Sequence, residues 1–552
     1  MNIELVPIYN GEYTRYQMDL DIPINVKTDN SIDPLTALVL EFVQTPDVLQ
    51  VIHARGRIWH GYAVQPMLAA VLLAAALCGK PSLRQMAKLA RFDIRFIHIL
   101  QGKQPSKSSF HRFLDEIKPD MKTIFYLFSD FIETKKDQIP LDLDTIYIDG
   151  TKYEACANKF TFIWKKSHAR YMTKFKEKAA RLITDLNVFL NDHQIDKTFS
   201  IITEPDPKYL AEIAATIAKF AEERNIEFVY GRGHRKPKAQ KLFDWADKLF
   251  DDSLRFYIQH DLLDGKNSCS KTDPDAVFLH MKYDYYCNTG VFKPGYNIQF
   301  GVSSQFIREI YVSTDANDMN TFIPFMEAYK AHYGEYPKKA VADAGYGSYD
   351  NYTYCFDKAI VPVIKYSTYE QEKHTRSKKN RFKSYNFKRI SATELRCPGG
   401  QALQLVSCRP ETRQKGRYPR LLETYATDKC AECPLRSQCT KSKTGRKITQ
   451  TAGLEEYHET VREILASEEG KELKKQRSIQ AEGTFGQLKQ DHDYDRLSRI
   501  GKSGVEFEIY LVALGHNIRK LSTLLSKEEA SEAIEEPIPE ASEDLWEAIT
   551  LI

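Results

Sequence analysis

Apolar residues recur at helical spacing through the first quarter of the chain. The longest apolar run, residues 67–78, has Pro66 near its start and Gly79 just past its end, which is typical of a buried helix. This run is too short to cross a bilayer, which takes about 20 residues. A second helix is predicted from Ser82, a residue favoured at N-caps, and a third from near Ser108. Their apolar faces comprise Leu83, Met86, Ala87 and Ala90, and Phe110, Phe113, Leu114 and Ile117.

Short helices joined by short turns, with a basic last member, suit a helix-turn-helix-like DNA-binding module. A bundle used for packing or dimerisation explains the same pattern, because no base-reading sequence is recognisable. We therefore predict a helical N-terminal domain, residues 1–140, for DNA binding or dimerisation.

The pattern changes to short β-rich runs after residue 142. One run, 143–148, ends at Asp149-Gly150-Thr151, and another covers 160–164. Residues 165–250 return to helical spacing, which predicts an inserted helical hairpin or small bundle. Strands are then expected at 296–302, 308–312 and 340–343, with a helix from 320 to about 333.

With the insertion set aside, the order is strand, further strands, helix, strand and a late helix. An RNase H-like core requires this order, although periodicity does not separate it from other α/β folds. The predicted class is α/β, with an RNase H-like core, a helical N-terminal domain, a helical insertion and a small zinc-ribbon-like insertion. The core is expected at 141–164, 263–365 and 448–525, the helical insertion at 165–262, a basic Cys-rich insertion at 366–447 and an acidic tail at 526–552.

Two aspartates follow predicted strands. Asp149 precedes Gly150, and Asp343 precedes Ala344 and Gly345. An acid at the carboxyl end of a strand, followed by glycine, lets the chain turn away and leaves the carboxylate facing a crevice. Taken alone, each aspartate is better explained as a turn residue.

A third acid, Glu482, is expected on the late helix. Glu482 and Lys489 are seven residues apart, two helical turns, and so share a face that can present a carboxylate to a metal and an ammonium to a phosphate. An exposed Glu–Lys pair on an amphipathic helix is the alternative.

The net charge of +3 conceals two charged regions. Residues 361–450 hold 21 Lys and Arg against 7 Asp and Glu, an excess of +14, whereas residues 526–552 hold 9 acids and one lysine, or −8. A basic block of this kind indicates a polyanionic partner, and an ordinary solvated surface is the alternative.

Six phrases of the chain carry a family resemblance. They are 149–155 (DGTKYEA), 157–164 (ANKFTFIW), 294–299 (PGYNIQ), 342–348 (ADAGYGS), 482–489 (EGTFGQLK) and 513–521 (ALGHNIRKL). In this order they resemble bacterial insertion-sequence transposases of the DDE superfamily, from about Ala63 to Leu521.

The resemblance implies that Asp149, Asp343 and Glu482 bind two divalent ions, Mg²⁺ or Mn²⁺, and are the catalytic carboxylates. Many relatives carry a Tyr, Arg, Glu and Lys signature around the glutamate. Here the positions seven and four before it are Lys475 and Ser478, so only Glu482 and Lys489 are kept, and nearby Arg477 is the candidate replacement for the arginine. The family's pattern also contains Asp273 and Asp275, which we interpret, like Asp318, as supporting or structural acids.

The residue types suit this chemistry. Mg²⁺ prefers carboxylate oxygens, and two such ions can activate a water or 3′-hydroxyl and stabilise the departing oxygen in an in-line displacement. The predicted function is DNA cleavage at insertion-sequence ends followed by strand transfer to target DNA. A transposase-derived DNA-binding protein without catalysis and a nuclease without strand transfer are the alternatives.

Four cysteines have the spacing of a zinc site. Cys430 and Cys433 form a Cys-x-x-Cys pair, and Cys397 and Cys439 can complete a tetrahedral Cys₄ site with structural Zn²⁺. Reduced thiols in a loop are the alternative. Cys408 is a further cysteine that could replace one of the four ligands.

Cations alternate with aromatics just before the cysteines, which suits phosphate binding and base stacking. The predicted DNA-binding residues are Arg376, Lys378, Lys379, Arg381 and Lys383, with Arg477, Lys489 and Arg496. The expected partners are double-stranded transposon-end and target DNA and further copies of the chain, in a homodimer or higher synaptic complex. Residues 1–19 lack a signal-peptide pattern, so we expect a cytoplasmic, nucleoid-associated protein without membrane attachment.

Overall fold

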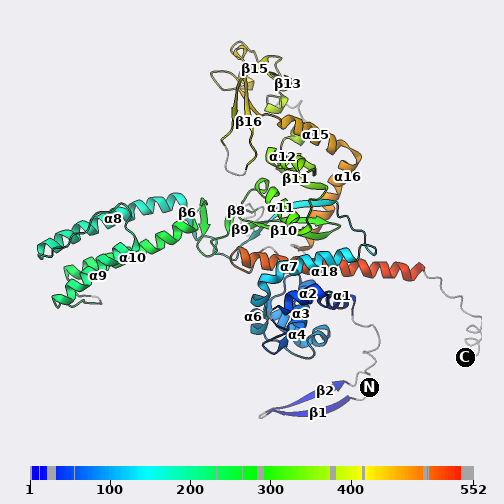
Figure 1. The fold of residues 1–552 in the computed structure, drawn as a ribbon, viewed down its shortest axis with the longest axis horizontal. Helices are drawn as coiled ribbons and strands as arrows, with labels where there is room; N and C mark the ends of the chain where they lie inside the picture. Colours follow the sequence, from blue (N-terminus) through cyan, green and yellow to red (C-terminus); the bar gives the residue numbers. More distant parts are fainter. Residues whose placement is uncertain are drawn as a thin grey trace, which may run out of the picture.

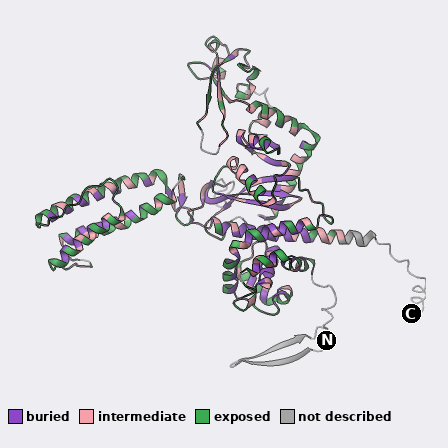
Figure 2. Cartoon of the chain, viewed as in Figure 1, coloured by how far each residue is buried: buried purple, intermediate pink, exposed green. Residues whose placement is uncertain are grey.

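The computed structural model describes residues 3–10, 13–20, 33–54, 56–231, 233–263, 265–281, 291–372, 381–412, 417–488, 494 and 496–535. Helices pack beneath a central sheet, a long helical arm projects to one side, and a small second sheet lies at the top (Figure 1). Buried residues concentrate where the helices meet the central sheet, whereas the arm and the second sheet are more exposed (Figure 2).

From residue 34 the N-terminal part is mostly helical, with one short hairpin of β3 (Ile58–Trp59) and β4 (Tyr62–Ala63). Its helices are α1 (Pro34–Val43), α2 (Pro46–His53), α3 (Val64–Cys78), α4 (Leu83–Phe92), α5 (Ile94–Ile99), α6 (Lys107–Ile117) and α7 (Met121–Thr134). The predicted buried helix is confirmed as α3, and Ser82 forms a capping box with Gln85 at the start of α4. The third predicted helix is α6, which begins one residue before Ser108 and is capped by Ser106.

A hairpin precedes these helices. Strands β1 (Ile3–Asn10) and β2 (Tyr13–Leu20) pair antiparallel. The periodicity of the sequence does not predict this hairpin within a domain expected to be helical.

The central sheet is mixed. Its order is β10 (Phe306–Ser313), β9 (Phe292–Ser303), β5 (Thr145–Glu154), β11 (Lys339–Gly347) and β12 (Val361–Tyr366), and β8 (Val277–His280) also pairs with β9. Strands β5, β11 and β12 run parallel, while β9 is antiparallel to β5 and β10. The mixed sheet with many helices agrees with the predicted α/β class.

Both faces of this sheet are covered. On one side Ile298 and Phe300 of β9 join the core formed with the N-terminal helices and α18 (Lys502–Glu535). On the other side Ile146 and Ile148 of β5 pack with α11 (Phe322–Tyr333), α12 (Tyr349–Asp357) and α15 (Leu454–Ala466). Burial on both faces explains why β9 is almost continuously buried.

The helical arm has a core of its own. It comprises α8 (Lys165–Asp192), α9 (Pro207–Glu223) and α10 (Lys238–Leu262), and its base is closed by pairing of β6 (Phe162–Trp164) with β7 (Ser268–Ser270). Figure 1 shows the arm extending away from the sheet.

The basic Cys-rich region forms the second sheet. Its strands follow the order β13 (Lys388–Ser391), β14 (Glu394–Arg396), β15 (Ala402–Pro410), β16 (Leu421–Ala426) and β17 (Ile448–Thr451), all antiparallel. The chain then returns to the central sheet through α15 and α16 (Glu468–Arg477).

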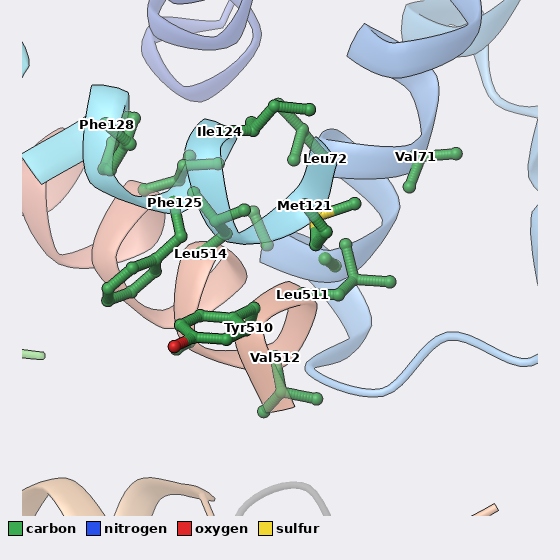
Figure 3. Close-up of a cluster of buried hydrophobic side chains, with 14 of the residues drawn as sticks. Val71, Leu72, Met121, Ile124, Phe125, Phe128, Tyr510, Leu511, Val512 and Leu514 are labelled. Atoms are coloured by element: carbon green, nitrogen blue, oxygen red, sulfur yellow. The ribbon is translucent and has the colours of Figure 1, made fainter. Parts of the chain in front are cut away.

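Helix α18 joins the C-terminal part of the chain to the N-terminal helices. Leu511 and Leu514 of α18 pack among side chains of α3 and α7 (Figure 3). Gly515 allows the closest approach, because a Cβ atom there would lie 2.4 Å from the backbone oxygen of Ala75 in α3. The resemblance phrase at 513–521 therefore includes a residue required by helix packing.

None of the described helices is by itself long and apolar enough to cross a membrane; two bent pairs, α1 with α2 and α3 with α4, pass that test only jointly, by length and composition.

Candidate active site

Sheet register places Asp149 and Asp343 next to one another. Residues Lys339 to Ala342 of β11 pair in parallel with Thr145 to Ile148 of β5. Asp343 and Asp149 each follow directly after the last pair, so the two aspartates leave adjacent parallel strands at the same level. This adjacency comes from pairing between segments almost two hundred residues apart.

The chain does not turn away after Asp149, as the sequence pattern predicts. Strand β5 continues to Glu154, because Asp149 to Glu154 remain paired with β9 on the other side. The parallel pairing between β5 and β11 ends at Ile148. Beyond this point the two strands are no longer paired, next to the Asp149 and Asp343 carboxylates. The prediction of a turn at Gly150 is therefore wrong. The Asp149 side chain is nevertheless one-fifth exposed (21%), so its carboxylate is accessible.

Each aspartate accepts a hydrogen bond from a glycine that follows it. Gly150 N donates to Asp149 Oδ1 at 2.9 Å, and Gly345 N donates to Asp343 Oδ1 at 2.8 Å. Gly150 has a second role, because a Cβ atom there would lie 2.8 Å from Asp318 Oδ1 and from the amide of Gln299. A side chain at this position would displace the polar groups beside Asp149.

A buried polar network supports the aspartates from β9. Asp318 Oδ1 accepts from Asn297 Nδ2 at 2.7 Å and from Gln299 Nε2 at 3.3 Å. The hydroxyl of Tyr346, near the end of β11, donates to Gln299 Oε1. Burial is the main cause that raises the pKa of Tyr346 well above its ordinary value, and the carboxylates of Asp318, Asp149 and Asp343 add to it. This tyrosine therefore remains a protonated donor.

Asn297, Gln299 and Tyr346 occur in the phrases that carry the family resemblance but are not among the predicted site residues, and Asp318 is predicted to be a supporting or structural acid. Asn297 and Gln299 are fully buried yet polar, and they alternate with the apolar Ile298 and Phe300. Two polar residues on one face of an otherwise apolar strand are the signal that could have identified them.

Glu482 lies in a distorted helical segment. α16 ends at Arg477 and continues as a π-helix, Ser478–Glu482, followed by α17 (Gly483–Gly486). Arg477 Nη2 donates to Glu482 Oε1 at 2.9 Å, and Arg477 Nη1 lies 3.8 Å from Asp149 Oδ2. One guanidinium thus joins two of the three predicted catalytic acids.

Residues 396–522 match a family model described as a transposase DDE domain. The match covers less than a quarter of the chain, and it supports a DDE-superfamily transposase. It contains Glu482, Arg477 and the four predicted zinc ligands, whereas Asp149 and Asp343 precede it. No curated protein and no solved structure matches the chain.

DDE transposases generally use divalent metal ions such as Mg²⁺. The oxygen donors of Asp149, Asp343 and Glu482 suit that ion. Nevertheless, within the described ranges no three His, Cys, Asp or Glu side chains are grouped so that they could hold a metal. The donor chemistry therefore fits, while Glu482 is paired with Arg477 instead of completing a ligand set.

Asp273 and Asp275 bind the backbone at the start of α18. Asp273 Oδ1 accepts from Gly501 N at 3.3 Å and from the Tyr296 hydroxyl at 2.8 Å, and Asp275 Oδ2 accepts from Lys502 N at 2.9 Å. These bonds satisfy backbone donors at the start of α18.

The four predicted zinc ligands line one small cavity of about 20 Å³ in the second sheet: Cys397, Cys430, Cys433 and Cys439. Burial raises the pKa of Cys439, Arg446 lowers it, and the other three cysteines raise it. Among the described residues, however, these thiols do not form a group that could hold a metal ion as they stand. Cys408 is exposed on β15 and does not line the cavity.

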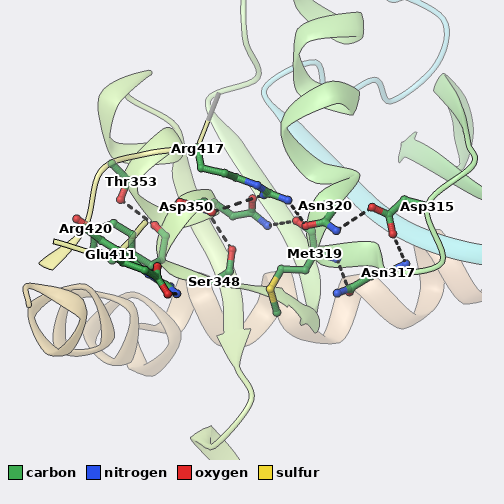
Figure 4. A network of polar contacts seen from close by, with 12 residues as sticks. Asp315, Asn317, Met319, Asn320, Ser348, Asp350, Thr353, Glu411, Arg417 and Arg420 are labelled. Atoms are coloured by element: carbon green, nitrogen blue, oxygen red, sulfur yellow. Dashed lines mark hydrogen bonds and ion pairs between the residues drawn. The ribbon is translucent and has the colours of Figure 1, made fainter. Parts of the chain in front are cut away.

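A loop of the second sheet contacts the rest of the chain near the acids. Arg417 Nη2 donates to Asn320 Oδ1 at 2.5 Å, and Arg417 Nη1 lies 3.5 Å from Asp350 Oδ2 (Figure 4). Asn320 belongs to the same 3₁₀ turn, Asp318–Asn320, that carries Asp318. A contact from the Cys-rich region thus reaches the turn beside Asp149.

The predicted DNA-binding residues are only partly described. Arg376, Lys378, Lys379 and Lys489 lie outside the described residues. Arg381 and Lys383 flank Phe382, which lines the cysteine cavity, and the Arg381 guanidinium lies 5.4 Å from the ring centre of Phe382. Arg496 is 3.7 Å from Glu154 at the end of β5, apart from the Arg381 segment in the chain.

Proposed function

We propose that this transposase cleaves DNA at insertion-sequence ends and transfers the freed strand to target DNA, with Asp149, Asp343 and Glu482 as its metal-binding carboxylates. The adjacency of Asp149 and Asp343 in the sheet register carries the proposal. The central sheet is proposed to be an RNase H-like core, since its parallel strands bring two of the acids to one edge.

Each of these residues has a proposed role in binding or positioning the metal ions. Asp149 and Asp343, each oriented by a glycine N–H, would hold the ions from the sheet, and Glu482 would approach from the helix. Two divalent ions supply activation of a water or 3′-hydroxyl and stabilisation of the departing oxygen. Tyr346 and Gln299 would keep Asp318 in place beside Asp149.

The direct test is incubation of the protein and Mg²⁺ with a duplex that carries the element's ends. Cleavage with a joined product supports the proposal. Cleavage without joining indicates a nuclease, and binding without cleavage indicates a DNA-binding protein descended from a transposase.

Zn²⁺ is proposed to be bound by Cys397, Cys430, Cys433 and Cys439, because all four line one cavity. A tetrahedral thiolate site would stabilise a sheet whose buried hydrophobic cluster is small. We expect one zinc per chain by metal analysis of protein purified without chelator, and loss of this zinc in Cys433→Ser. Cys408→Ser, at the exposed cysteine, should retain it; zinc-free wild-type protein would contradict the assignment.

Arg381 and Lys383 are proposed to bind the DNA backbone. Both side chains lie in the basic region, and Arg381 stacks near an aromatic ring. In the double variant Arg381→Gln/Lys383→Gln, the slope of log K against log salt concentration should become shallower by about two, because each lost phosphate contact removes about 0.9.

A matched double variant tests whether this effect is local. Lys338 directly precedes β11, and Lys358 follows α12 shortly before β12, so both lie towards the ends of these strands opposite Asp343. Lys338→Gln/Lys358→Gln removes the same charge and should leave the slope unchanged. Equal slopes for the two double variants would refute the assignment of Arg381 and Lys383.

A further inference from the structure

Arg477 lies between two carboxylates that the proposed function assigns to metal binding. Its guanidinium is within 2.9 Å of Glu482 Oε1 and 3.8 Å of Asp149 Oδ2. The side chains of Arg477 and Asp149 are about one-fifth exposed (22% and 21%), whereas Glu482 is more than half exposed (55%). The arginine is therefore the inner member of its pair with Glu482.

The local backbone makes this pairing possible. Residues five apart in an α-helix differ by roughly 140° around the axis, so Arg477 and Glu482 would not face each other there. The π-helix at Ser478–Glu482 winds the chain more widely and brings them to one face. Such π segments are frequent at functional sites.

The π-helix is fixed to the sheet from its centre. Gln480 Oε1 accepts from Gln305 N in the turn between β9 and β10 at 2.5 Å, and Ala481 is fully buried. Thr484 Oγ1 donates to the backbone oxygen of Gln480 at 2.7 Å. Since the backbone is anchored, Glu482 can change partner by moving its side chain alone.

We infer that Arg477 is the internal counter-ion of the metal-free acidic site, and that metal binding releases it to contact a DNA phosphate. The inference rests on the proposed function and deepens it. A guanidinium between Asp149 and Glu482 offsets their mutual repulsion, but it also repels a divalent cation that approaches the same oxygens. Once cations satisfy the acids, the arginine loses its two partners and is available to an external anion.

Asp149 and Asp343 are already adjacent through the sheet, and Glu482 is the member held by an alternative cation. The pairing couples completion of the metal site to the availability of a DNA-binding side chain.

The first test measures Mn²⁺ binding without DNA, by electron paramagnetic resonance of the free ion. Arg477→Gln should bind Mn²⁺ about three- to tenfold more tightly than the wild type, as expected for removal of a competing, partly exposed ion pair. Lys475→Gln is the matched control, because Lys475 is 73% exposed and lies near Glu472. Unchanged or weaker Mn²⁺ binding by Arg477→Gln would overturn the inference.

Two further variants keep the result decisive. If Arg477→Gln does not fold by circular dichroism, Arg477→Lys replaces it, since one ammonium cannot pair with both acids as a guanidinium does. It should bind Mn²⁺ at least about twofold more tightly than the wild type, and equal affinity would count against the inference. Asp149→Asn should lose Mn²⁺ binding; if it does not, the proposed metal site itself fails, and the inference with it.

The second test measures DNA binding with Ca²⁺ or with chelator. In Ca²⁺ the salt slope of the wild type should exceed that of Arg477→Gln by about one phosphate contact, and in chelator the two slopes should coincide. The same slope for both proteins in Ca²⁺ would overturn the release of Arg477 to DNA. A merely structural arginine would not produce a difference that depends on the metal.

Discussion

Asp343→Asn is expected to lower cleavage of an end-containing duplex in Mg²⁺ by at least about a thousandfold. The amide keeps the shape of the side chain and removes the charge that would hold the ion beside Asp149. Loss of the several kcal/mol that metal coordination contributes at the transition state corresponds to about three powers of ten in rate. The measurement is single-turnover cleavage of labelled DNA, with protein in excess.

An exposed carboxylate provides the control for this change. Asp357, at the end of α12, is 53% exposed and lies 2.9 Å from Lys358. Asp357→Asn should cleave at the wild-type rate. Full cleavage by Asp343→Asn would remove Asp343 from the proposed site, and equal losses in both variants would indicate a general effect on the fold.

Gly515→Ala is expected to destabilise the protein by about 2 to 3 kcal/mol, although alanine favours helices by about 1 kcal/mol over glycine. The added methyl would lie 2.4 Å from the backbone oxygen of Ala75, so α18 and α3 must separate. Neighbouring Leu511 and Leu514 would lose contacts with the shared core. The midpoint of urea unfolding, followed by circular dichroism, reports the change.

At Gly486 the same substitution is not expected to lower the free energy of unfolding. This glycine ends α17, and a Cβ atom there would meet nothing within 4 Å. Gly486→Ala should therefore be neutral or stabilise by up to about 1 kcal/mol. A Gly515→Ala protein as stable as the wild type would show that the α3–α18 contact can relax.

Local patterns predicted much of the secondary structure. Helix α3 follows from its apolar run between a proline and a glycine, and α4 from the Ser82 cap. These signals are short-range, because helix spacing and capping involve residues within four positions of one another. The strand before Asp149 is likewise predicted from a local signal, a short run of β-favouring residues.

The extent of β5 could not be predicted in this way. Periodicity indicated an end at Asp149, but pairing with β9 extends the strand to Glu154. The hairpin of β1 and β2 is a second example. In both cases a partner strand, and not local preference, determines where the strand lies.

In the candidate site, too, some features follow from the sequence and others only from the tertiary structure. The sequence by itself determined which residue types are candidates for its chemistry: the acids Asp149, Asp343 and Glu482 through phrases that resemble DDE transposases, and the cysteines and basic residues through their spacing. Only the tertiary structure decided how they meet. Parallel register aligned Asp149 with Asp343, burial gathered Asp318 with Gln299 and Tyr346, and a π-helix turned Arg477 towards Glu482. The physical reason is that residue types specify which interactions are available, whereas contacts between distant segments depend on how the sheet and helices pack as a whole.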